Sequence, residues 1–433
     1  MIAGIALGAL TFAVYMVGSN RNFGYDAAAT FTNFIATPSL QDAFAVRSVV
    51  PTIPVTQVAT NDHVLLSLLS HLIFSVSGTR TEAVYRVIPA LAAAVTVGLS
   101  TVVMSRRFGL LAGVCAGVFI ATDSLFVDNS RDLRGYSLAA LGSVVATLIV
   151  AGKWTRWRLV AYAVVMGLAI TAQLFAGIVL LCHFAWLLTR RRRADLVAFL
   201  PAGAAAGLAG LAAYAGIYVT EFTKHGLPPS YFYPTFPRDL VLFLLGAPVL
   251  LAVGLWLASA GLGLWTVRDR VWTWTTLGVL AAAVLVLWLG LQPAFLYPRF
   301  FMFLVPALGY LMASAIKRWW VIGPIVLAGA VAAGIGEAPT YTVDPLALRQ
   351  AAAAVEQIHS AGGRACVIHS DEQILSAYTT DFTVVSRADQ LSSCDAVVVV
   401  SWGIDVGLRN EAAQEFPRLR TIDAYYPAVV LER

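Results

Sequence analysis

One carboxylate stands close to the end of the first apolar segment of the chain. Residues 1–18 are almost wholly apolar, and Tyr25 and Asp26 follow a few residues later. A carboxylate at the depth of a membrane surface is a candidate for function, because it can remove a proton from a hydroxyl group. Aspartate is also a favoured helix cap, so Asp26 could instead begin a helix over residues 27–35. The sequence alone leaves both interpretations open.

The segment 128–136 brings together residue types that suit a phosphate group. It reads Asp-Asn-Ser-Arg-Asp-Leu-Arg-Gly-Tyr and so contains Arg131, Arg134 and Tyr136. The guanidinium fork of arginine can donate two hydrogen bonds to phosphate oxygens. The alternative is that both arginines pair with the two aspartates of the same segment, which would leave nothing for a ligand.

Two further candidates lie in separate polar segments. Arg299 stands among aromatic residues in the segment 297–300, where such side chains also serve as plain anchors at a membrane interface. His63 follows Asn61 and Asp62 at the start of an apolar stretch, where a lone histidine is more often structural than a ligand. The sequence has neither an H-E-x-x-H motif nor a paired C-x-x-C. It therefore predicts no cofactor, and no ligand spacing supports a divalent metal.

The composition is that of a chain that lies largely in lipid. The 433 residues are 59% hydrophobic and only 12% charged, which is far from the balance of a soluble domain. The net charge of +5 comes from basic residues in short runs between apolar segments. Such runs are typical of membrane topology signals, so we exclude nucleic acid as a partner.

About eleven apolar stretches approach the length of roughly 20 residues that a membrane-spanning helix needs. If these spans alternate, the basic runs between them all face one side, which the positive-inside rule makes the cytoplasm. The N-terminus is then cytoplasmic, whereas the segment 20–83 and all residues after 336 face outward. The stretch 64–76 is too short to span, and we expect a juxtamembrane helix on the outer leaflet. The expected spans lie near residues 1–19, 84–104, 109–127, 137–152, 158–172, 173–189, 196–219, 239–265, 272–291, 300–316 and 319–336.

The predicted fold is an α-helical polytopic membrane protein with a small C-terminal α/β extracytoplasmic domain. Residues 1–336 are the transmembrane domain, with 20–83 as its first extracytoplasmic loop, and residues 337–433 are the small domain. Cys366 and Cys394 both lie in the small domain and could form a disulfide in an oxidising compartment. The patterns there predict a helix over 351–358 and strands over 365–369, 396–400 and 424–431.

Several of these segments resemble the GT-C superfamily of polytopic glycosyltransferases, especially the branch with protein O-mannosyltransferases and the aminoarabinose transferase of lipid A. Members carry an acidic residue after the first span, a polar segment before a juxtamembrane helix, an arginine entering the second span, an R-x-Y-S/A-L motif and a late R-Y/F segment before a proline. The chain has these features in the same order. The matching residues are Tyr25-Asp26, Asn61 to Leu65, Gly78 with Arg86 and Ala90, Arg134 to Leu138, and Arg299-Phe300 with Pro306.

The resemblance implies transfer of a sugar from a polyprenyl-phosphate donor, with inversion, to a hydroxyl group of an envelope glycan, a lipid or a protein. Asp26 would be the base that deprotonates the acceptor. Arg134, Tyr136 and Arg299 would surround the donor, and His63 would stand near its phosphate. The active site would lie at the outer face of the plasma membrane, which the chain crosses several times. The candidates for substrate binding are Arg134, Arg299, Arg131, Tyr136, His63 and Tyr25.

The chain departs from the family pattern at two residues, and two other function classes are alternatives to a glycosyltransferase. Ala27 stands where many members have glutamate, which weakens any two-carboxylate metal site, and Val64 replaces the usual proline. A lipid or sugar transporter, or a catalytically inactive scaffold, would also be rich in apolar residues. Transporters usually place ionisable residues near the middle of the bilayer, whereas polar residues here crowd the outer ends of the spans. That placement favours chemistry at the interface.

Overall fold

The computed structural model describes most of the 433 residues. They divide into two compact units. The first, called the helical unit, comprises Met1–Val17, Asp62–Leu66 and Arg86–Thr340, and the second, called the mixed unit, comprises Gly18–Asn61, Ser67–Tyr85 and Tyr341–Arg433. Asn61, Asp62 and most of the expected span 272–291 lie outside the described residues. The described residues are 1–44, 47–48, 58–59, 63–189, 193–220, 238–240, 250–267, 273, 277, 280–281, 284, 297–400, 406–422 and 428–432.

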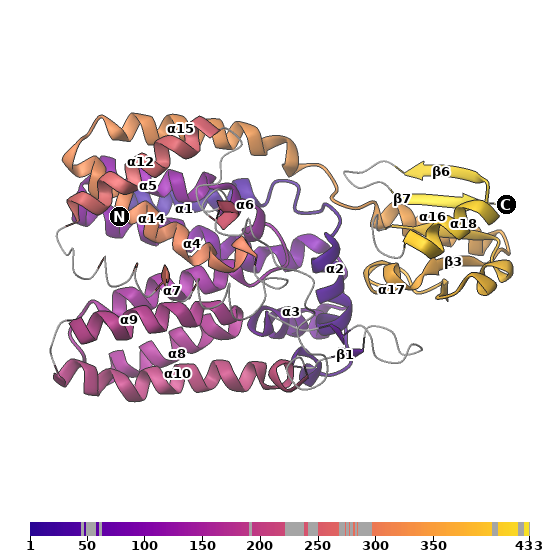
Figure 1. Cartoon of the computed structure of the whole chain (residues 1–433), viewed down its shortest axis with the longest axis horizontal. Helices are drawn as coiled ribbons and strands as arrows, with labels where there is room; N and C mark the ends of the chain where they lie inside the picture. The colour runs from indigo at the N-terminus through magenta and orange to yellow at the C-terminus, as the bar shows by residue number, and fades with distance from the viewer. Residues whose placement is uncertain are drawn as a thin grey trace. The chain divides into compact units, whose positions relative to one another are not determined.

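The helical unit is built from apolar helices, most of which run side by side in Figure 1. One group packs α7 against α8 and α8 against α10, and a second packs α5, α12, α14 and α15 together. The helices are α1 (Ile2–Tyr15), α4 (Glu82–Phe108), α5 (Leu110–Thr122), α6 (Ser124–Ser130), α7 (Tyr136–Val150), α8 (Arg156–Ala172), α9 (Gly177–Thr189), α10 (Arg193–Thr220), α12 (Leu250–Thr266), α14 (Val305–Arg318) and α15 (Ile322–Glu337), with 3-10 helices η3 (Leu174–Ala176), η6 (Pro298–Leu304) and η7 (Ala338–Tyr341).

Small residues let α1 lie close against α4. A Cβ atom at Gly4 would lie 2.6 Å from the carbonyl oxygen of Gly98, and one at Gly8 would lie 2.9 Å from that of Ala94. The two glycines of α1 are one helical turn apart on the same face, which is the small-residue spacing typical of close helix pairs in membranes. Larger side chains at these positions would push the two helices apart.

The predicted count of eleven spans is not confirmed. Within the described residues, three helices are long and apolar enough to cross a membrane: Glu82–Phe108, Ala194–Gly216 and Pro298–Arg318. A fourth is added if α5 and α6, which are bent by 59° at their junction, count as one span. The side chain of Asp123 caps α6 there by accepting a hydrogen bond from the backbone N–H of Phe126. A cap of this kind ends one helix and starts the next inside an apolar stretch.

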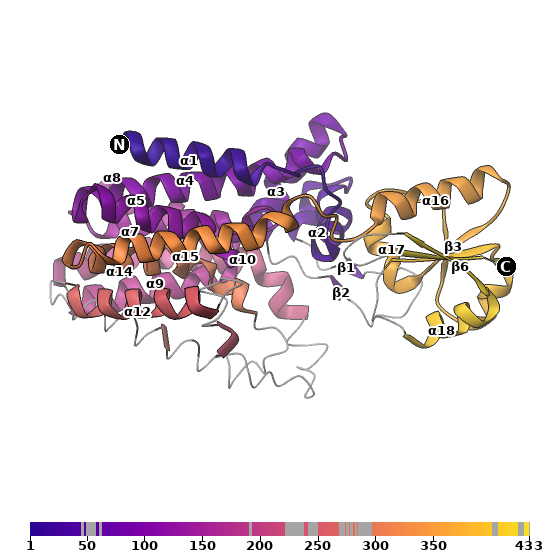
Figure 2. The ribbon, with the colours of Figure 1, turned by 90° about the horizontal axis from the view of Figure 1, so that it is seen from above.

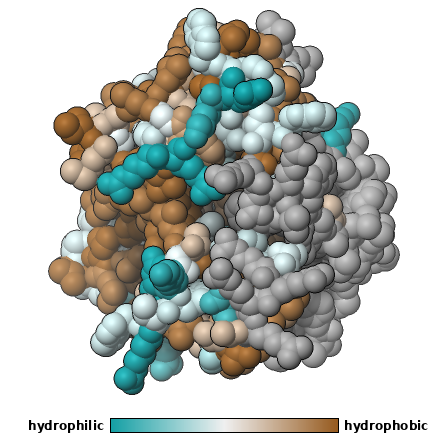
Figure 3. All heavy atoms as spheres, turned by 90° about the vertical axis from the view of Figure 1, so that its left-hand side faces the viewer, coloured by the Kyte–Doolittle hydropathy of each residue, from teal (hydrophilic) through white to brown (hydrophobic). Residues whose placement is uncertain are grey.

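Basic residues lie in the last turns of two neighbouring helices. Arg106 and Arg107 are in the last turn of α4, and Lys317 and Arg318 are in the last turn of α14. The Lys317 ammonium donates a hydrogen bond of 3.3 Å to the Arg107 carbonyl, so these turns lie together. Figure 3 shows hydrophilic residues in strips between hydrophobic surface on one face of the molecule. This clustering is the pattern behind the predicted cytoplasmic side, and the orientation stays a prediction.

The mixed unit joins the first loop to the C-terminal residues, whereas the sequence suggested one boundary near residue 336. The contacts of residues 20–23 with residues 344–378, described below, are the physical reason. Its elements are α2 (Tyr25–Thr30), the π-helix η1 (Phe31–Ile35), η2 (Leu40–Phe44), β1 (Arg47–Ser48), β2 (Val58–Ala59), α3 (Val64–Ser77), α16 (Leu348–Ser360), β3 (Ala365–Ile368), α17 (His369–Leu375), β4 (Thr383–Val385), η8 (Ala388–Ser393), β5 (Ala396–Val399), α18 (Val406–Glu415), β6 (Arg418–Ile422) and β7 (Ala428–Glu432).

The larger sheet of the mixed unit has five strands in the order β4-β3-β5-β7-β6. β3 pairs in parallel with β4 and β5, while β7 pairs antiparallel with β5 and β6. β3 and β5 are wholly buried apolar runs, as expected for strands that are covered on both faces. Figure 2 shows α16 on one face of the sheet and α18 on the other. Because α17 begins directly after β3, it starts at the carboxyl edge of the parallel strands.

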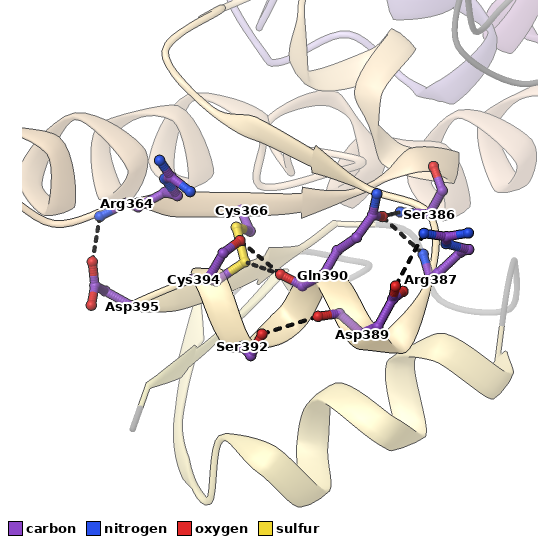
Figure 4. Close-up of a disulfide and its surroundings, with 10 residues drawn as sticks. Arg364, Cys366, Ser386, Arg387, Asp389, Gln390, Ser392, Cys394 and Asp395 are labelled. Atoms are coloured by element: carbon purple, nitrogen blue, oxygen red, sulfur yellow. Dashed lines mark hydrogen bonds and ion pairs between the residues drawn. A yellow bond between two sulfur atoms is a disulfide. The ribbon is translucent and has the colours of Figure 1, made fainter.

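Cys366 and Cys394 form the disulfide that the sequence left open. The bridge joins β3 to the end of η8, just before β5, and Figure 4 shows it beside Gln390. The Gln390 side-chain oxygen accepts hydrogen bonds from the backbone N–H groups of Ser386 and Arg387, at 2.8 and 3.1 Å. The disulfide therefore closes the connection between the neighbouring strands β3 and β5, which contains α17, β4 and η8.

Candidate functional site

Asp26 is the second residue of α2. The N-cap of this helix is Gly24, and no side chain caps it. The interpretation of Asp26 as a helix cap is therefore wrong, because the helix begins at Tyr25, two residues earlier than the sequence suggested. The Asp26 side chain is half-buried. A carboxylate can accept a proton from a hydroxyl group, which is the role that the sequence suggested for Asp26.

The phenol of Tyr25 connects α2 to α17. The Gln373 side-chain amide donates a 2.7 Å hydrogen bond to the Tyr25 hydroxyl. Burial raises the pKa of Tyr25 above 10.0, and the charges of Asp371 and Asp26 raise it further, although the Gln373 hydrogen bond lowers it in part. Tyr25 therefore stays a neutral phenol around neutral pH. The influence of both carboxylates on its pKa indicates that Asp26 and Asp371 lie in its electrostatic surroundings.

The polar residues at the start of α17 serve different purposes. Asp371 is 1% exposed, and its carboxylate accepts a 2.7 Å hydrogen bond from the backbone N–H of Val400, just beyond the end of β5. This bond fixes α17 to the neighbouring strand. His369, Glu372 and Gln373 are half-buried and lie toward the surface. Sequence reasoning missed all of α17, because its seven residues show no apolar periodicity.

Replacing Glu372 by glutamine is expected to stabilise the mixed unit near pH 7 and to leave it unchanged well below pH 4. Burial raises the pKa of the Glu372 carboxyl above 4.5, although the charge of His369 lowers it in part. The folded state thus holds the proton more tightly than the unfolded state, so the native chain loses stability as the pH rises through the raised pKa. Thermal unfolding midpoints of both proteins at the two pH values measure this. A variant less stable at both would contradict it.

Three of the predicted residues, His63, Tyr136 and Arg299, lie in one aromatic cluster at one end of the helical unit. The rings of His63 and Tyr136 pack edge to face, with centroids 4.6 Å apart. Tyr136 also lies 6.3 Å from the ring of Phe300, which brings the loop before α7 to the segment that carries Arg299. The Arg299 guanidinium stands 4.7 Å from the ring centre of Tyr297. Residues from three distant parts of the sequence therefore share one aromatic cluster.

Gly135 allows the chain before α7 to lie close to the end of α8 and to His63. A Cβ atom at Gly135 would lie 2.3 Å from the carbonyl oxygen of Ala172 and 3.1 Å from Nδ1 of His63. Only glycine fits there, and Nδ1 of His63 contacts the same Ala172 oxygen at 3.1 Å. The Arg-Gly-Tyr sequence noted above thus places Arg134 and Tyr136 on either side of a close approach to α8. The sequence showed the motif but not the reason for its glycine.

The arginines of this end of the helical unit are buried to different degrees. Arg131 is 2% exposed and Arg134 8%, whereas Arg299 is half-buried. Arg131 donates from Nε to the carbonyl of Tyr15 at 3.3 Å and from Nη2 to that of Val17 at 2.6 Å. It thus caps the end of α1, which leaves it less suited to a ligand than the other two. Buried guanidinium groups favour an anionic ligand, since charge-assisted hydrogen bonds are strong away from water.

The part of the chain that the structure describes contains no cluster of metal-ligating side chains. No group of three or more histidine, cysteine, aspartate or glutamate residues there could hold a metal ion. The free cysteines of the described chain, Cys115 and Cys182, are both buried in the helical unit. The candidate residues are a carboxylate in the mixed unit and arginine, histidine and tyrosine side chains in the helical unit.

Comparison with known proteins relates the chain to several solved structures. No protein-family model matches the sequence, and no curated protein matches it. ArnT from Cupriavidus metallidurans in the apo state matches with a TM-score of 0.61 and 14% identity, over 98% of this chain and 97% of that one. The same protein bound to undecaprenyl phosphate gives a TM-score of 0.60 at 14% identity with the same coverage.

Another solved protein that matches is an oligosaccharyltransferase from Archaeoglobus fulgidus, in a complex with zinc and sulfate. Its TM-score is 0.54 at 13% identity, over 92% of this chain and 67% of that chain. At these identities the similarity establishes the fold. Because the ArnT match extends over nearly the whole of both chains, the shared fold includes the C-terminal residues as well as the helices.

Proposed function

Because the chain has the GT-C fold, as ArnT and the archaeal oligosaccharyltransferase do, we propose that it is a membrane glycosyltransferase that uses a polyprenyl-phosphate sugar as donor. The observation that carries this proposal is the cluster of His63, Tyr136 and Arg299 at one end of the helical unit, with Arg134 two residues before Tyr136. Cationic and hydrogen-bonding groups among aromatic rings suit a phosphate with an apolar tail. ArnT, which shares the fold, has been solved with undecaprenyl phosphate.

Each residue of the helical unit has a distinct part in donor binding. Arg134 and Arg299 hold the phosphate oxygens, and His63 and Tyr136 line the site beside them. Arg131 contributes mainly by fixing the end of α1. When the sugar leaves, these arginines stabilise the negative charge that gathers on the phosphate.

Asp26 is the general base of the proposed reaction. The acceptor hydroxyl oxygen attacks the anomeric carbon, and its proton passes to the Asp26 carboxylate. The bond between that carbon and the phosphate oxygen breaks, so the polyprenyl phosphate leaves with the bonding electrons. One displacement of this kind inverts the anomeric carbon. Because Tyr25 stays neutral, its phenol can position the acceptor without competing for the proton.

The disulfide supports an active site outside the cytoplasm. Disulfides persist in oxidising compartments and are rare in the cytosol. The Cys366–Cys394 bridge belongs to the mixed unit, and so does the segment that carries Asp26. We therefore place both on the outer face of the plasma membrane, with the N-terminus in the cytoplasm. The acceptor is then a hydroxyl group of an envelope glycan, a lipid or a protein.

Transfer of labelled sugar by the purified chain in liposomes tests this function. Synthetic undecaprenyl-phosphate sugars, including mannose and arabinofuranose, serve as donors, and envelope extracts supply the acceptor. The native chain should release undecaprenyl phosphate and label the extract. If no donor turns over but labelled lipid moves between the leaflets, a flippase becomes the better description.

Replacing Arg299 by glutamine is expected to raise the KM for the donor by about 10-fold to 100-fold, because a charge-assisted hydrogen bond to phosphate is lost. The matched control is Arg318→Gln, which removes an exposed arginine from the last turn of α14. That variant should keep the native KM. Equal effects of the two substitutions would show that Arg299 acts only through the overall charge of the protein.

A further inference from the structure

One tyrosine of the C-terminal region is bonded directly to the chain just before α2. The Tyr378 hydroxyl accepts a 2.8 Å hydrogen bond from the backbone N–H of Phe23 and donates a 2.7 Å hydrogen bond to the carboxylate of Glu82. The rings of Phe23 and Tyr378 also lie near each other, with centroids 6.2 Å apart. Phe23 directly precedes Gly24, the N-cap of the helix that carries Asp26.

Glu82 is held in turn from the C-terminal region. Its side chain is 2% exposed and forms an ion pair with Arg349, which also donates to the carbonyl of Asn20. Burial of Arg349 lowers its pKa, but the hydrogen bond and charge of Glu82 outweigh this and leave the pKa raised. A buried carboxylate bonded to both a guanidinium and a phenol has little freedom to move. Glu82 therefore fixes the direction of the Tyr378 hydroxyl.

The residue before Phe23 is fixed by the same region. Asn22 is fully buried, and its backbone N–H donates to the Asp344 carboxylate at 2.7 Å. Its side-chain amide donates to the Leu346 carbonyl at 2.8 Å and to the Gln350 side chain at 3.0 Å. Asn20, Asn22 and Phe23 are thus hydrogen-bonded to residues that lie more than 300 positions later in the chain.

From these contacts we propose that Tyr378, held by Glu82, is a positioning residue that sets how α2 presents Asp26. The proposal rests on the proposed function, in which Asp26 is the base. α2 runs directly into the π-helix η1, and together they span only Tyr25–Ile35, so this short helical segment depends on tertiary contacts, including those at its start. A catalytic group displaced by about 1 Å can lose about 100-fold in rate. The C-terminal region then acts in catalysis through the geometry of Asp26.

The test removes one oxygen atom and measures two properties. Tyr378→Phe keeps the ring against Phe23 but loses both hydrogen bonds. We expect kcat to fall about 10-fold to 100-fold with the donor KM unchanged. Hydrogen exchange of peptides that cover residues 22–30 should become about 2-fold to 10-fold faster, whether or not the protein is active. The exchange measurement keeps the positioning contact testable if sugar transfer itself is not found.

The matched control is Tyr85→Phe. Tyr85 is also buried in the mixed unit, and its hydroxyl donates to the carbonyl of Thr79, away from residues 20–23. This variant should keep the native kcat and the native exchange of residues 22–30. Equal loss of kcat in both variants would reduce Tyr378 to a general structural role and overturn the proposal. Native exchange in Tyr378→Phe, or a kcat within twofold of the native value, would overturn it as well.

Glu82→Gln independently tests whether Glu82 acts through its hydrogen bond to Tyr378. Because Glu82 and Tyr378 act through one hydrogen bond, the double variant should lose no more kcat than the more affected single variant. Fully additive losses would mean that the two residues act separately, which would overturn the proposal. A native chain without any transfer activity, combined with faster exchange in Tyr378→Phe, would overturn the proposed function and leave the contact itself established.

Discussion

Replacing Asp26 by asparagine is expected to lower kcat for sugar transfer by about 100-fold or more, while the donor KM changes little. Asparagine has nearly the same shape as aspartate but cannot take up the proton of the acceptor hydroxyl. The residue sits at the second position of α2 and not at the cap, so the helix start at Gly24 is kept. Steady-state rates with labelled donor, native chain against variant, measure the effect.

Asp389→Asn is the control for the loss of one carboxylate from the mixed unit. The Asp389 side chain is 66% exposed and pairs with the exposed Arg387 across the surface, as Figure 4 shows. Exposed pairs of this kind contribute little to stability, so the variant should match the native rate. If Asp26→Asn transfers sugar as fast as the native chain, the base of the reaction lies elsewhere and the role of Asp26 is lost.

The local patterns of the C-terminal region predicted several elements well. Buried apolar runs indicated β3 and β5, and the predicted helix over 351–358 lies inside α16. A few consecutive residues determine such elements, so the spacing of apolar residues is enough to predict them. The hydrogen bond between Tyr25 and Gln373 joins residues 348 positions apart, and no local sequence pattern predicts it. The partners of the candidate base could therefore be found only in three dimensions.

Hydropathy was a weaker guide to where helices end. The apolar stretch 109–127 was predicted as one span, but it bends by 59° where Asp123 caps α6. The end of α8 at Ala172 agrees with the boundary predicted between the stretches 158–172 and 173–189, and Gln173 is the C-cap of that helix. The bend at Asp123 was not predicted. A window that averages hydropathy passes over a single capping residue, although that residue redirects the chain. The motif order, by contrast, predicted the fold that the solved structures share.

Removing the disulfide with Cys366→Ser and Cys394→Ser together is expected to lower the free energy of unfolding of the mixed unit by about 3–4 kcal/mol. The two cysteines are 28 residues apart, and this value follows from the chain entropy of a loop of that length. Thermal unfolding of the native chain with and without a reductant, compared with the double variant, measures it. Reductant should lower the native midpoint to that of the variant and leave the variant unchanged.

Removal of the disulfide should also lower the rate of sugar transfer. β3, which carries Cys366, leads directly into α17, and α17 holds Gln373 against Tyr25 beside the candidate base. At temperatures just below the lowered midpoint, the double variant should therefore lose transfer activity while the native chain keeps it. If the variant unfolds earlier but retains full kcat where its sheet has melted, the C-terminal region is a stabilising element alone and Asp26 is positioned without it.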